Sequence, residues 1–103
     1  MNPSYSRSIP SEWQGMSKIF IALGDEHRQR ILLMFEPGER LTVNQIAGAS
    51  ALSRPAVSHH LKILREAEIL QCTKEGKQIW HWVDHARIAD CLRAVLNFVE
   101  PAP

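Results

Sequence analysis

The stretch over residues 41–65 constrains the fold most, because it contains the start signals of two helices in close succession. Thr42 is suited to cap a short helix, and Gln45 stands three residues later as the partner of a capping box. Ser53 is suited to cap a second helix, and Pro55 lies in the first turn of that helix, where a missing N–H costs little. Because the two helices are so close in sequence, a tight turn must join them, which predicts a helix-turn-helix.

Further elements are expected on both sides of this motif. Helical spacing of apolar residues, capping signals and runs of β-formers predict them. They are a helix over residues 11–23, a helix capped by Asp25, strands over residues 69–73 and 78–83 with Lys74-Glu75-Gly76-Lys77 as the hairpin tip, and a last helix from Asp84 to about Val99. Four helices, a β-hairpin wing and a C-terminal helix make the predicted fold class mainly α (α+β), a winged helix-turn-helix.

Length and charge limit what such a fold can do. A chain of 103 residues is expected to form one domain, which we place over residues 11–100. The polar residues 1–10, with Pro3 and Pro10, predict a disordered tail and not a signal peptide. No apolar run approaches the length of a membrane span, so a cytoplasmic protein without a membrane partner is expected. Since the net charge is only +1, any affinity for nucleic acid must come from a local basic face.

The second helix of the motif has such a face. On a helical wheel, Val57, Leu61 and Leu64 lie on an apolar arc, together with His60, which is expected to pack or to form hydrogen bonds inside the domain. The opposite arc is small, polar or basic, which suits a helix that enters the major groove of double-stranded DNA. The residues expected to contact DNA from this helix and its cap are Ser53, Arg54, Pro55, Ser58, His59, Lys62 and Arg65. The plainer alternative is an amphipathic surface helix with solvated charges.

Two flanking places add weaker candidates for contacts with DNA. Thr42 and Asn44 can bind a phosphate from the N-terminus of their helix, although capping alone accounts for their positions. Lys74 and Lys77 at the tip of the predicted wing can reach the minor groove or its phosphates. A hairpin turn with two solvated lysines explains this second pair equally well.

Several segments, in order, resemble a known family. The run ALGDEHRQRIL at residues 22–32 looks like the opening of ArsR-type (ArsR/SmtB) repressors, and LTVNQIA at residues 41–47 is similar to their first motif helix. LSRPAVSHHLKILREA at residues 52–67 is very similar to their recognition helix, and the hairpin with Glu75-Gly76-Lys77 fits as well. The resemblance covers about residues 16–99. It implies a winged-helix homodimer, paired through its first and last helices, that represses a promoter on operator DNA until an inducer releases it.

Two apolar stripes fit the implied dimer. One lies on the first predicted helix and the other on the last. The expected interface residues are Trp13, Met16, Phe20, Leu23, Ile88, Leu92, Val95 and Val99. Packing inside a single chain is an equally good explanation for any one of them.

The metal sites of the resembled family are not matched here. One such site needs paired cysteines in the first motif helix, and residues 41–47 contain none. Another begins with an Asp-x-His pair in the last helix, whereas Asp84 is followed by His85 and then Ala86. The later positions of that site supply no histidine either, since they are Asn97, Phe98 and Glu100. We therefore expect no metal site and no cofactor, with Asp84 as a cap and His85 as a surface residue.

The two cysteines leave a redox alternative open. Some members of the resembled family respond to persulfide or oxidant through a cysteine pair, so the alternative is a thiol-responsive repressor that uses Cys72 and Cys91. Such a switch needs backbones that come within about 7 Å. The thiol-sensing members pair cysteines in the second and last helices, and the second helix here has none. A metal site between subunits using Cys91, His81 or His85 is less favoured still.

Other functions are poorly supported by the sequence. It contains no phosphate-binding glycine-rich loop, no nucleophile–base pair and no cluster of metal ligands, so an enzyme is not expected. A winged-helix module that binds a protein partner remains as a second hypothesis. The basic outer arc of the second motif helix argues against it, because a protein-binding version would more often be apolar or acidic there. The inducer stays unknown.

Overall fold

The computed structural model describes residues 1–5 and 7–103, so the expected tail over residues 1–10 includes one residue, Ser6, that lies outside the described part. The elements in chain order are the 3-10 helix η1 (Ser11–Trp13), α1 (Met16–Leu23), α2 (Glu26–Leu33), β1 (Leu41–Thr42), α3 (Val43–Ala49), α4 (Arg54–Glu66), β2 (Leu70–Glu75), β3 (Gln78–Val83) and α5 (His85–Val99). This order confirms the predicted winged helix-turn-helix.

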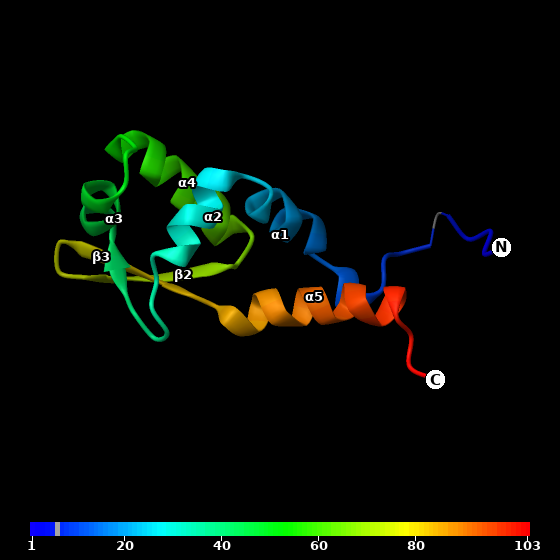
Figure 1. The fold of residues 1–103 in the computed structure, drawn as a ribbon. Helices are drawn as coiled ribbons and strands as arrows, with labels where there is room; N and C mark the ends of the chain where they lie inside the picture. Colours follow the sequence, from blue (N-terminus) through cyan, green and yellow to red (C-terminus); the bar gives the residue numbers. More distant parts are fainter. Residues whose placement is uncertain (6) are drawn as a thin grey trace.

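The molecule is elongated, with extents of 52 × 27 × 26 Å. Helices α1 to α4 gather beside a small sheet, while α5 runs along the outside of this group (Figure 1). Both chain termini lie at the end of the molecule that is remote from the β2–β3 hairpin (Figure 1). The hairpin and the α3–α4 pair therefore share the other end.

The core surrounds α4. One face of this helix is completely buried, because apolar side chains recur along it at helical spacing. Side chains from α1, α2, α3 and the start of the wing pack against that face. The fully buried apolar residues are Ile19, Ile31, Ile46, Val57, Leu61, Leu64, Ile69 and Leu70. Helix α5, which is described throughout, contributes less to this core than α4 does, since Cys91 is its only buried residue.

The first helix is shorter than the sequence predicts. A single helix over residues 11–23 was expected, but η1 ends at Trp13 and α1 begins only at Met16. Gly15 between them has φ +75°, a left-handed conformation that glycine adopts without steric cost. A Cβ at this position would lie 2.6 Å from Nη2 of Arg87 on α5. The glycine therefore breaks the helix and leaves room for the guanidinium of Arg87 beside the backbone.

The sheet has one strand more than the sequence predicts. The strand order is β1-β3-β2 and all pairs are antiparallel. Leu41 and Thr42 pair with His81 and Trp80, which fastens the start of α3 to the wing. The hairpin strand β2 also continues to Glu75, so the turn consists of Gly76 and Lys77 alone, with Gly76 at φ +62°.

Both expected caps of the helix-turn-helix are present. The Thr42 hydroxyl accepts a hydrogen bond from the Gln45 N–H at 3.2 Å, and Oε1 of Gln45 accepts one from the Thr42 N–H at 2.8 Å. This reciprocal pair is a capping box. The Ser53 hydroxyl accepts a hydrogen bond from the Ala56 N–H at 3.3 Å at the start of α4. These local bonds fix where each helix begins.

Replacing Ser53 by alanine is expected to lower the free energy of unfolding by about 1 kcal/mol, because one N–H at the start of α4 loses its acceptor. Urea unfolding monitored by far-UV circular dichroism measures this loss. Ser58→Ala is the matched control, since Ser58 is exposed within the same helix and its loss should change stability by less than about 0.5 kcal/mol. Equal effects of the two substitutions would contradict the capping role.

Candidate nucleic-acid interface

Helix α4 presents a continuous polar face to solvent. Its opposite face is anchored, since Val57, Leu61 and Leu64 have no exposed surface. The exposed residues of the outward face and its cap are Ser53, Arg54, Pro55, Ser58, His59 and Lys62, and the acidic Glu66 ends this face at the last residue of α4. Among the described residues, Arg54 and Lys62 form no ion pair within the chain. Their cationic groups are thus available to an external anion.

Arg65 differs from the rest of the predicted outer arc. It is half-buried, and its Nη1 lies 3.1 Å from Nε2 of His81 on β3. The helical wheel places Arg65 on the outer arc because it takes only the residues of α4 into account. In the structure, β3 of the wing contacts the last turn of the helix at Arg65. The structure therefore gives Arg65 a partner inside the molecule that the sequence interpretation did not include.

Helix α3 precedes α4 and contributes one exposed candidate. Asn44 is exposed in the first turn of α3. Thr42 is only 6% exposed, and its hydroxyl is occupied by the capping box. Burial follows from its place in β1, where it pairs with Trp80. The Thr42 side chain thus orients α3 and has little surface to offer a ligand.

The wing carries its two lysines on different elements. Lys74 lies in β2 opposite Ile79, and Lys77 lies in the turn, with both side chains exposed. Beside them on the sheet, the Arg40 guanidinium lies 5.8 Å from the Trp80 ring and 5.3 Å from the Trp82 ring. Arg40 also donates a hydrogen bond from Nη2 to Glu75 Oε1 at 3.0 Å. This stacking and the bond to Glu75 brace one face of the wing.

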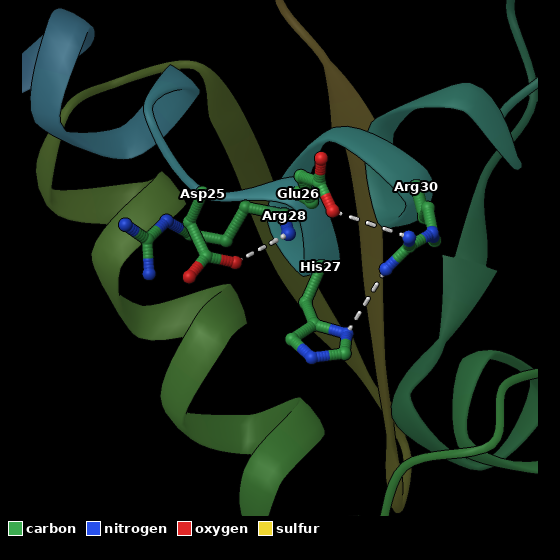
Figure 2. Close-up of polar contacts among 5 residues, drawn as sticks. All are labelled: Asp25, Glu26, His27, Arg28 and Arg30. Carbon is green, nitrogen blue, oxygen red and sulfur yellow. Dashed lines mark hydrogen bonds and ion pairs between the residues drawn. The ribbon is translucent and has the colours of Figure 1, made fainter.

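Helix α2 joins α1 to α4 through a buried arginine. Asp25 caps α2 by accepting a hydrogen bond from the Arg28 N–H at 3.1 Å (Figure 2), and this bond lowers the pKa of Asp25 below its ordinary value. The Arg28 side chain donates from Nε to the Ala22 carbonyl at 2.8 Å and from Nη2 to the Ile21 carbonyl at 2.9 Å. These carbonyls belong to the last turn of α1, where the Gly24 N–H also donates to the Ile21 carbonyl at 3.2 Å and Arg28 supplies the donor for the Ala22 carbonyl.

The same arginine reaches the back of α4. Its Nη1 lies 3.4 Å from Nδ1 of His60, which is half-buried as its place on the apolar arc predicts. Since a guanidinium can only donate, His60 accepts through Nδ1. Burial, assisted by the charge of Arg28 and opposed by Asp25, lowers the pKa of His60. His60 is therefore held neutral between α2 and α4, while its neighbour His59 faces solvent.

The predicted dimer stripes are only partly exposed. On α5, Leu92 is 48% and Val99 is 65% exposed, while Ile88 and Val95 are half-buried. The structure adds Leu96 to this face, at 52% exposed.

On the N-terminal side, Phe20 is 42% exposed, but Met16 belongs to the core and has little surface left for a partner. Leu23 is half-buried. Trp13 is also half-buried and packs edge-on against Phe98, with ring centroids 5.8 Å apart. Ile21 is a further exposed residue on α1.

The two cysteines lie in different environments. Cys72 is exposed on β2, and Cys91 is buried on α5. Burial raises the pKa of the Cys91 thiol, which lowers the fraction of reactive thiolate. In the part of the chain that the structure describes, no three His, Cys, Asp or Glu groups are placed to hold a metal ion. Within the same residues, no helix has the length and apolar content to cross a membrane.

Comparisons with known proteins extend this picture. The family described as bacterial regulatory protein, arsR family, matches residues 25–71. The transcriptional repressor SdpR of Bacillus subtilis (strain 168) is 32% identical over 84 residues, which are 82% of this chain and 92% of that protein. The arsenical resistance operon repressor of Staphylococcus aureus is 30% identical over 81 residues, or 79% of this chain and 77% of that protein.

Solved structures agree in fold. An ArsR-like transcriptional regulator from Rhodococcus sp. RHA1 superposes with a TM-score of 0.77 over 86% of this chain and 83% of that chain, at 22% identity. At this identity the likeness supports the fold alone. The relatives are transcriptional regulators, and they favour neither the protein-interaction module nor the thiol-responsive alternative.

Proposed function

Because this chain belongs to the ArsR family of DNA-binding transcriptional regulators, which are not enzymes, we propose that it acts as a homodimeric repressor of operator DNA in the cytoplasm. In this proposal, α4 lies in the major groove and its exposed polar face contacts the base edges. Asn44 and the wing lysines reach the flanking phosphates.

The exposed face of α4 is the observation that carries the proposal. A major groove about 12 Å wide admits a helix whose outward side chains are short, or are extended and able to form hydrogen bonds. Arg54 stands near the N-terminus of α4, where recognition helices contact bases, and its guanidinium suits a guanine edge. Lys62 stands two turns later and suits the phosphate backbone, where a contact positions the protein without selecting sequence.

The dimer is supported by the apolar surface of α1 and α5. Phe20, Ile21, Leu92, Leu96 and Val99 are each at least 42% exposed. A second copy that covers these side chains would remove apolar area from water, which is the main driving force for such association. A two-fold dimer would present two α4 helices to half-sites about 34 Å apart, as helix-turn-helix dimers do.

The test combines Arg54→Ala with His59→Ala and measures gel-shift affinity for a duplex selected from a random pool. We expect specific affinity to fall at least about tenfold, because a lost bidentate base contact alone is worth about 1–3 kcal/mol. The dimer should stay folded, since both side chains are exposed.

The matched control is Arg30→Ala with His27→Ala, which removes the same two residue types from exposed positions on α2, outside the proposed dimer surface. This control should bind the duplex as the unchanged protein does. Equal affinity of the α4 variant and the unchanged protein would refute the assignment of α4 as the recognition helix.

A further inference from the structure

The hydrogen bond between Arg65 and His81 joins the last turn of α4 to the wing. Nη1 of Arg65 lies 3.1 Å from Nε2 of His81. Because a guanidinium has only donors, Nε2 must be the unprotonated acceptor, and the proton of the neutral imidazole sits on Nδ1. The bond therefore exists only while His81 is neutral.

The surroundings of His81 keep it neutral and away from any DNA. The residue is 1% exposed, in the middle strand of the sheet. It pairs with Leu41 of β1 on one side and with Cys72 of β2 on the other. Burial and, second, the Arg65 charge lower the pKa of His81, and nearby carbonyls of Ile79 and Leu41 oppose this shift only in part. Within the described residues, Nδ1 has no hydrogen bond of ordinary geometry.

We propose that Arg65 and His81 are positioning residues that fix the wing relative to the recognition helix. The inference rests on the proposed function, because it concerns how α4 and the wing lysines reach one duplex together. The two residues act without touching DNA themselves, which replaces the sequence interpretation of Arg65 as a DNA contact.

The geometry of the wing explains why one bond has this influence. Lys77 in the turn precedes His81 by four residues, or about 13 Å of extended chain. A small rotation of the sheet at His81 is therefore enlarged at the tip of the wing. The Arg40 stacking stiffens the opposite face of the wing but involves no residue of α4. The Arg65–His81 hydrogen bond directly links α4 to β3 of the wing.

The test is a double-mutant cycle between this pair and the wing lysines. His81→Leu removes the acceptor, Arg65→Gln removes the guanidinium, and Lys74→Ala with Lys77→Ala removes the contacts of the wing. We expect each of the first two to weaken operator binding about tenfold or more. When His81→Leu or Arg65→Gln is added to the lysine variant, binding should weaken little beyond that of the single changes. The reason is that a misplaced wing has already lost the contacts that the lysines make.

Two further variants sharpen the result. His81→Gln places an amide oxygen near the position of Nε2, so it should keep affinity within about threefold of the unchanged protein by preserving the acceptor. Lys62→Gln is the matched control for a direct contact, since Lys62 is an exposed cation on the same helix. The loss of binding free energy caused by Lys62→Gln should add to the loss caused by the wing-lysine variant, as it does for independent sites. Nitrogen-15 NMR of His81 should show the proton on Nδ1.

Three outcomes would overturn the inference. The first is that His81→Leu binds the operator as tightly as the unchanged protein, and the second is that the loss of binding free energy from Arg65→Gln adds fully to the loss from the lysine variant. The third is that NMR places the His81 proton on Nε2. If His81→Leu does not fold by circular dichroism, then Arg65→Gln with the lysine cycle and the His81→Gln variant decide the question. A failure of the proposed function would look different, because the unchanged protein would then bind no selected duplex.

Discussion

The Leu61→Ala variant is expected to lose about 2–5 kcal/mol of its free energy of unfolding, a large part of the stability of a small domain. Leu61 has no exposed surface and lies on the face of α4 that the core surrounds. Its truncation removes buried apolar area and leaves a cavity that the neighbouring side chains fill only in part. Urea unfolding at one fixed protein concentration measures the loss, since stability of a dimer depends on concentration.

Lys62→Ala is the control at the next position. Its side chain is exposed, so the free energy of unfolding should change by less than about 0.5 kcal/mol, while operator affinity should fall. The two neighbours thus separate the two faces of one helix. A Leu61→Ala variant as stable as Lys62→Ala would show that this helix is not packed as described.

Arg28→Ala is expected to lower the free energy of unfolding by about 1–3 kcal/mol, since the Ala22 carbonyl then loses its donor and a buried acceptor left without one costs about that much. The residue is 9% exposed and donates to the Ile21 and Ala22 carbonyls at the C-terminus of α1, of which the Ile21 carbonyl also accepts from the Gly24 N–H. A cation at this end of a helix is also favoured by the helix dipole. Thermal unfolding followed by circular dichroism, with and without the substitution, measures the effect.

Arg30→Ala is the matched control on the same helix. The Arg28 and Arg30 side chains leave α2 in opposite directions (Figure 2). The Arg30 side chain is 65% exposed and forms a surface ion pair with Glu26 at 3.4 Å, which is worth at most about 1 kcal/mol. If both arginines contributed equally to stability, the special role of Arg28 at the end of α1 would be refuted.

The sequence predicted the helix-turn-helix well because its signals are local. Thr42 and Ser53 each bond to a residue three positions later, so the start of α3 and of α4 can be recognised from a few consecutive letters. The exposed face of α4 followed from periodicity for the same reason. Gly15 was missed because the apolar spacing continues across it, although its left-handed backbone interrupts the helix.

Contacts between distant segments were beyond the sequence interpretation. Strand β1 has only two residues and forms by pairing with β3, far along the chain. Arg65 similarly meets His81 only because the wing folds back over α4. One signal was available: alternation along β3 places His81 on the face opposite to Trp80 and Trp82, which indicates an inward imidazole in need of a partner.

The placement of the tryptophans gives the chain built-in optical reporters. Trp80 and Trp82 lie under the Arg40 guanidinium on the wing, whereas Trp13 lies against Phe98 of α5 at the remote end of the molecule. Indole emission depends on the polarity and charge around the ring. The emission of Trp80 and Trp82 therefore reports on the wing, and that of Trp13 reports on the remote end of the molecule. With Trp13 replaced by phenylalanine, the remaining tryptophan fluorescence would come from Trp80 and Trp82 on the wing alone and would follow its engagement with a duplex in real time.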